Sequence, residues 1–162
     1  MSDAPVLSPP PTLPGRLEGI IAEFADLEPQ ERLELLLDFA NSLPPLPPEY
    51  QARKDAGENR VHECMTPVFL WVELHDGRLT IHAHVAEEAP TVKGFVSILA
   101  EALRGARPEE ASRIPTDLLA RLGLQQALGM TRMRGLHAIL HRLRTSVEKG
   151  AQQKSAAQAS TS

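Results

Sequence analysis

The spacing of apolar residues changes twice along the chain, and this change constrains the fold more than any other feature of the sequence. Over residues 13–43 apolar residues recur every three or four positions, which predicts two helices, the second beginning at Pro29. Over residues 68–85 they alternate with other residues, which predicts two strands. Helical spacing returns after Pro90. We therefore expect an α+β domain, in which a small antiparallel sheet has helices packed on one face.

The connection between the two predicted strands supports a hairpin. Asp76 and Gly77 lie between the alternating stretches 68–74 and 79–85. An Asp-Gly pair favours a tight hairpin turn because glycine accepts a positive φ without strain. We also expect a short further strand at residues 59–62, with Pro67 limiting its pairing to the hairpin.

Proline and small polar residues mark the expected domain boundaries. Ten of the 14 prolines lie in the first 50 residues, nine of them in clusters at 5–14 and 44–48. The first cluster predicts a disordered leader over residues 1–12, and the second a stiff connector after a helix that ends at Leu43. Residues 150–162, mostly Ala, Gln, Ser and Thr, predict a disordered tail. The folded domain is expected to span residues 13–149.

Cys64 is the only cysteine, and this limits the chemistry of the chain. A single cysteine excludes an intramolecular disulfide and any metal cage built from cysteines alone. The sequence has no apolar run of 18 residues that would predict a membrane span, and its start does not resemble a secretory signal. We expect a cytoplasmic protein, because reducing conditions keep a free thiol available.

Charge is distributed unevenly along the chain. Residues 1–103 carry 7 basic and 17 acidic side chains, whereas residues 104–150 carry 9 basic and 4 acidic ones. The overall charge of −4 and the lack of interleaved aromatic residues argue against nucleic-acid binding. The basic region, which includes Arg132 and Arg134, instead predicts steering toward an acidic protein partner.

The position of Cys64 makes it the first candidate for chemistry. It lies just before the first predicted strand, where a rigid scaffold can present a reactive group. The neighbouring His62 and Arg60 favour a thiolate, whereas Glu63 opposes one. A buried, unreactive cysteine is the competing interpretation, and from the residues alone it is the commoner outcome.

Three segments resemble one family. The stretch 59–71, Asn-Arg-Val-His-Glu-Cys-Met-Thr-Pro-Val-Phe-Leu-Trp, resembles the active-site segment of the SufE family, which accepts sulfur from cysteine desulfurases in iron–sulfur cluster assembly. Residues 88–94, ending in Val-Lys-Gly, resemble the segment that opens a helix in this family. Residues 124–136, with Arg132 and Gly135, resemble its closing motif. The segments occur in the family's order, and the resemblance covers about residues 13–149 and implies a SufE-like fold.

The resemblance implies a function for the thiol. Cys64 would take persulfide sulfur from a pyridoxal-phosphate-dependent cysteine desulfurase, stimulate that enzyme and deliver the sulfur to an iron–sulfur scaffold. One thiol suffices, because a shuttle needs no resolving cysteine. The chain would be a sulfur-transfer protein rather than a stand-alone enzyme, without a cofactor or metal of its own. It would bind neither nucleic acid nor membrane, and a homodimer is compatible with this function.

The resemblance also points to residues around the thiol. Those that we expect to support Cys64 or to bind the partner are His62, Glu63, Met65, Lys93 and Arg132. Arg132 matches the arginine of the closing motif, although a plain surface residue at a helix start is the competing interpretation. We interpret Gly94 as a residue that permits close packing rather than one that takes part in chemistry. Glu63 stands where the family usually has Gly, and it would be strained if this position has a positive φ.

Two other functions remain open from the residues. A cysteine hydrolase would use Cys64 with His62, but it needs an oriented base, and no third orienting group is evident. A zinc-stabilised interaction domain would combine these two residues with His82 and His84. The spacing of the latter pair is short and nonspecific, so we favour a solvated sheet face for both histidines.

Overall fold

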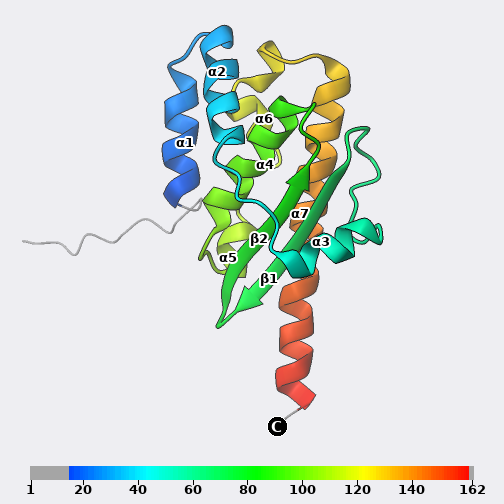
Figure 1. Ribbon diagram of the computed structural model, residues 1–162. Helices are drawn as coiled ribbons and strands as arrows, with labels where there is room; N and C mark the ends of the chain where they lie inside the picture. The colour runs from blue at the N-terminus through cyan, green and yellow to red at the C-terminus, as the bar shows by residue number, and fades with distance from the viewer. Residues whose placement is uncertain (1–14, 161–162) are drawn as a thin grey trace, which may run out of the picture.

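The computed structural model describes residues 15–160, and the side chains of residues 16–150. Its elements in chain order are α1 (Gly15–Ala25), α2 (Pro29–Ala40), α3 (Pro48–Asp55), β1 (Val68–His75), β2 (Arg78–Val85), α4 (Pro90–Leu103), α5 (Pro108–Ala111), α6 (Leu118–Arg121), the 3₁₀ helix η1 (Leu124–Gln126) and α7 (Met130–Ser160) (Figure 1). The predicted α+β class is confirmed: a two-stranded antiparallel sheet is surrounded by helices.

The hairpin has the predicted register and turn. β1 and β2 pair along their whole length, from Val68 opposite Val85 to the last pair before the turn. Asp76 and Gly77 have φ angles of 52° and 78°, the left-handed values that a tight hairpin turn requires. The prediction of a further strand at residues 59–62 is wrong in its length. The structure forms only an isolated bridge there, between Arg60 and Phe69. Asn59, with a φ of 58°, interrupts the extended backbone at its start.

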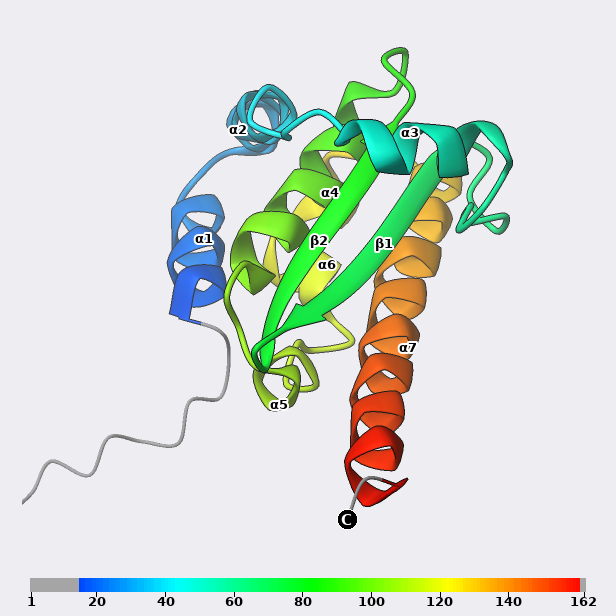
Figure 2. The ribbon, with the colours of Figure 1, turned by 60° about the horizontal axis from the view of Figure 1, so that its bottom comes forward.

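One face of the sheet packs against the long helices. Apolar side chains on this face, such as Leu70 and Leu79, are buried in the main core. Figure 2 shows α4 behind β2 and α7 beside β1. α4 is the central helix, since most of its residues are buried. It is crossed by α2 at Gly94, where a Cβ would lie 2.1 Å from the carbonyl oxygen of Leu36. The interpretation of Gly94 as a close-packing residue is therefore confirmed.

The opposite face carries a helix that the sequence analysis missed. The proline cluster 44–48 was expected to be a connector alone, but Pro48 begins α3, where a proline fits the first turn. Tyr50 of α3 packs edge-on against Trp71 of β1, at 5.4 Å between ring centroids, and stacks on His82 of β2 at 4.4 Å. His82 and His84 are half-buried, so the expectation of a solvated face needs correction: α3 covers much of it.

The described residues include most of the C-terminal stretch but not the predicted leader. α7 continues to Ser160, beyond residue 149, where we expected the folded domain to end. Alanine, glutamine and lysine in this stretch are good helix formers, which favours continuation of the helix. The predicted leader, residues 1–12, lies outside the described residues. Among residues 15–160, no helix has both the length and the apolar character needed to cross a membrane.

Candidate functional site

Cys64 lies in a loop that is anchored at both ends and exposed at its tip. Val61 and Val68, which flank the loop, are fully buried, and the N–H of Val61 donates to the carbonyl of Val68 at 2.8 Å. His62 and Glu63 are exposed, and Met65 is 85% exposed. Cys64 itself points inward and is only 4% exposed. The loop therefore surrounds a sheltered thiol with accessible neighbours.

The Cys64 thiol lines a cavity of about 350 Å³. Its walls come from three parts of the chain: the cysteine loop, the stretch from Glu88 to Val92 that leads into α4, and the first turns of α7 with Arg132 and Gly135. The cavity is therefore assembled from segments that lie far apart in the sequence. It leaves room for an added group beside the sulfur atom.

Gly135 forms the wall nearest to the thiol. A Cβ built on this buried glycine would lie 3.1 Å from the Cys64 sulfur, closer than an ordinary van der Waals contact. The backbone of α7 thus leaves space for the sulfur because no side chain occupies position 135. We did not identify Gly135 as a site residue from the sequence, although a glycine inside a helix pattern signals a packing or functional reason.

Arg132 lies at the edge of this cavity. The guanidinium Nη1 donates a hydrogen bond to the hydroxyl of Thr91, which ties the start of α7 to the start of α4. Arg132 is exposed, so its remaining donors are available to solvent or to a partner. Glu88, which the sequence analysis quoted only as part of a motif, contributes the opposite charge to the cavity lining.

The structure brings together some of the residues expected around Cys64 and leaves others apart. Met65 and Arg132 line the thiol cavity, whereas His62 and Glu63 do not. Among the described non-glycine residues only Asn59 and Asp76 have a positive φ, so Glu63 carries no such strain. It replaces a glycine without a backbone penalty of that kind.

Lys93 lies away from the thiol. Its ammonium forms an ion pair with Glu87 at 2.8 Å, and its side chain lines a different cavity, which also contains His84. The sequence placed Lys93 in the helix-opening motif but could not show which side of the helix start it occupies. The structure shows that Lys93 and its neighbour Val92 line different cavities, and only Val92 lines the thiol cavity.

The geometry does not support the two alternative functions. No hydrogen bond joins His62 to Cys64 in the part of the chain that the structure describes, so the pair needed for a cysteine hydrolase is not assembled. Within residues 16–150, no group of three or more His, Cys, Asp or Glu side chains could hold a metal ion. His82 is instead stacked on Tyr50.

Comparisons with known proteins agree on one family. The SufE family model, described as an Fe-S metabolism associated domain, matches residues 18–147. An uncharacterized SufE-like protein of Mycobacterium tuberculosis is 36% identical over 139 residues, which cover 85% of this chain and 95% of that protein. SufE-like protein 1 of Arabidopsis thaliana is 30% identical over 131 residues, 80% of this chain and 34% of that protein. The solution structure of a hypothetical protein from Thermus thermophilus superposes with a TM-score of 0.73, at 35% identity, covering 86% of this chain and 98% of that one.

Proposed function

This chain belongs to the SufE family, and we propose from that membership that it takes sulfur from a pyridoxal-phosphate-dependent cysteine desulfurase onto Cys64 and delivers it for iron–sulfur cluster assembly. One observation carries the proposal: the only cysteine lines a sheltered cavity with room beside its sulfur atom. The family domain itself is associated with Fe–S metabolism.

The proposed transfer is a thiol–persulfide exchange. The Cys64 thiolate attacks the terminal sulfur of a persulfide on the desulfurase, and a new S–S bond forms on Cys64. The S–S bond on the desulfurase breaks, and its cysteine leaves as a thiolate. The exchange is redox-neutral, because one S–S bond replaces another. Removal of the persulfide frees the desulfurase for its next turnover, which is how the chain would stimulate it.

The cavity suits a bound persulfide. Cys64 is 4% exposed, so the terminal sulfur would be shielded from other thiols that could release it as sulfide. Arg132 on the cavity wall supplies a positive charge next to the anionic persulfide. These two features support a carrier more than a protein in which the cysteine is only a small apolar core residue.

The surface beside the cavity suits a protein partner. Met65 and Met130 are 85% and 78% exposed, and both adjoin residues that line the thiol cavity. Flexible, polarisable methionine side chains adapt to partner surfaces. Arg132 and Arg134 are exposed in the same region of α7, which favours an acidic patch on the desulfurase. The proposed compartment is the cytoplasm, where the thiol stays reduced.

Mass spectrometry of the intact protein tests this proposal. The chain is incubated with a pyridoxal-phosphate-dependent cysteine desulfurase and L-cysteine, and we expect the mass of one or more sulfur atoms to be added to the wild type. Cys64→Ser should remain unmodified. His62→Ala should still be loaded, since no hydrogen bond joins His62 to the thiol among the described residues and His62 does not line the thiol cavity. Sulfur addition that persists in Cys64→Ser, or a wild type that stays unmodified while the desulfurase turns over, would contradict the proposal.

A further inference from the structure

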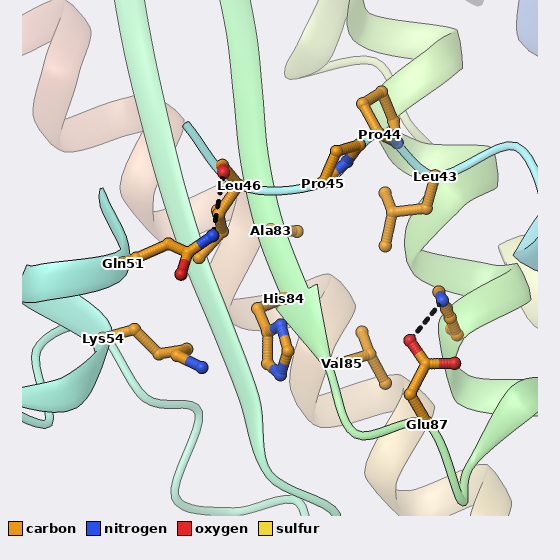
Figure 3. Close-up of a pocket in the computed structure, with 11 residues that line it drawn as sticks. Leu43, Pro44, Pro45, Leu46, Gln51, Lys54, Ala83, His84, Val85 and Glu87 are labelled. Atoms are coloured by element: carbon orange, nitrogen blue, oxygen red, sulfur yellow. Dashed lines mark hydrogen bonds and ion pairs between the residues drawn. The ribbon is translucent and has the colours of Figure 1, made fainter. Parts of the chain in front are cut away.

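A second cavity, of about 280 Å³, lies at the edge of β2 away from the thiol (Figure 3). One side of it is apolar and is formed by the connector between α2 and α3, with Leu43, Pro44, Pro45 and Leu46. Basic side chains from three elements also line it: Lys54 of α3, His84 of β2 and Lys93 of α4. The cavity therefore combines an apolar wall with basic side chains.

The ammonium group of Lys54 forms only one long ion pair among the described residues. Its side chain is 25% exposed, and its only ion pair among the described residues is with Asp55, at 3.9 Å. The Asp55 carboxylate is itself 77% exposed, so it remains largely solvated. Figure 3 shows the Lys54 side chain extending from α3 toward β2, where His84 lies. A weakly paired ammonium can bind an additional anionic partner.

Lys93 and His84 are the other two basic residues that line the cavity. The Lys93 side chain is 20% exposed and pairs with Glu87, whose own side chain is 80% exposed and is the only carboxylate lining the cavity. Two ammonium groups therefore face one carboxylate. This leaves the cavity with an excess positive charge, which a single bound anion would offset.

We propose that this cavity binds a small organic anion, whose carboxylate or phosphate group lies beside Lys54 and His84 and whose short apolar body packs against Leu43–Leu46. The volume suits a molecule smaller than the ligands of typical drug-sized pockets. A lysine ammonium group acts as a point charge, so it can bind either a carboxylate or a phosphate.

Protonation of His84 should be coupled to this binding. The charged groups that face it are Lys54 on α3, Lys93 on α4 and Glu87 in the loop before α4. Burial and the lysines lower the pKa of His84, whereas Glu87 raises it. A bound anion opposes the effect of the lysines and would raise this pKa. The affinity should therefore increase as the pH falls from the pKa of His84 in the complex toward its lower pKa in the free protein.

Calorimetric titration of the full chain at low ionic strength tests the proposal with defined probes. Hexanoate supplies both the charge and the apolar body, hexanamide supplies the body without the charge, and inorganic phosphate supplies the charge alone. We expect hexanoate to bind most tightly. Lys54→Met should weaken its binding about tenfold or more, because it removes a charge-assisted hydrogen bond. Lys149→Met, which changes an exposed lysine of α7, should have no effect.

Several results would overturn this assignment. They are the absence of hexanoate binding, equal binding of hexanamide and hexanoate, and an affinity that Lys54→Met leaves unchanged. Lys93→Met gives an independent second variant, and amide NMR spectra verify that each variant is folded. His84→Gln should retain binding but lose most of its pH dependence. The titration uses neither a desulfurase nor the thiol, so Cys64→Ser should bind hexanoate as the wild type does.

Discussion

The Cys64 thiol occupies the space that the absent side chain of Gly135 leaves on α7. A Cβ on Gly135 would lie 3.1 Å from the cysteine sulfur, so α7 determines how deeply the thiol can lie. The depth of the sulfur is therefore set by a helix that is distant in sequence from the cysteine loop. This contact links the fold of the C-terminal half to the chemistry of the loop.

Gly135→Ala should push the thiol outward. The added methyl group overpacks the contact, which should lower the free energy of unfolding by about 1 kcal/mol and expose the sulfur. We expect faster reaction of Cys64 with a small aromatic disulfide reagent than in the wild type, measured by absorbance. Gly129→Ala is the matched control, because a Cβ there would have no neighbour within 4 Å. Equal labelling rates for Gly135→Ala and the wild type would contradict the proposed role of this contact.

Arg132→Ala should slow the loading of Cys64 with sulfur. The substitution removes the positive charge at the cavity edge and the hydrogen bond to Thr91. A lost charge-assisted interaction corresponds to a decrease of about tenfold in the rate, measured by intact mass against time of incubation with a desulfurase. Arg134→Ala, which removes an exposed neighbouring charge outside the cavity lining, is the control. If both variants slow equally, the effect is general steering rather than a role in the cavity.

Gly94→Ala should destabilise the whole domain. Its Cβ would lie 2.1 Å from the carbonyl oxygen of Leu36, a backbone atom that can move only if α2 and α4 separate. We expect a loss of about 3 kcal/mol or more in the free energy of unfolding, measured by urea denaturation. Gly19→Ala, on α1 with no neighbour within 4 Å, should instead be neutral or stabilise by up to about 1 kcal/mol. Wild-type stability in Gly94→Ala would show that the helices do not cross this closely.

Tyr50→Ala should detach α3 from the sheet. Tyr50 is 7% exposed, packs on Trp71 and donates its hydroxyl hydrogen to the Glu73 carboxylate. We expect a loss of about 3 kcal/mol and a red shift in the fluorescence of Trp71, the only tryptophan in the chain. Glu49→Ala, at an exposed position of the same helix, should leave the emission unchanged. An unshifted spectrum in Tyr50→Ala would contradict this packing.

Acidification should destabilise the protein through His84. Burial and Lys54 lower the pKa of His84 from 6.5, so the folded state binds a proton less readily than the unfolded state. The stabilising contribution is present above pH 6.5 and decreases as the pH falls from 6.5 toward the lower pKa of the folded state. His84→Asn should flatten the pH dependence of the free energy of unfolding in this window. His137→Asn, at an exposed site on α7, should keep the wild-type slope.

Local patterns predicted the parts of the fold that depend on local chemistry. The hairpin followed from alternating residues around Asp76-Gly77. α3 was missed because the prolines between Pro44 and Pro48 indicate a connector. A short helix begins there all the same, and Tyr50 of this helix is buried against Trp71. The strand expected at residues 59–62 is only an isolated bridge, because Asn59 adopts a left-handed conformation. Both errors come from tertiary contacts or backbone angles that apolar spacing does not encode.

The family, the α+β class and the single residue able to carry a sulfur atom all follow from the amino-acid sequence, because they depend on local motifs and on a count of one cysteine. The surroundings of that residue follow only from the way the elements pack. Packing joins Cys64 to Arg132 and Gly135 and places Lys93 in the second cavity beside Lys54 and His84. Consecutive residues at a helix start, such as Val92 and Lys93, can face different cavities, and their surroundings depend on which other elements pack against them.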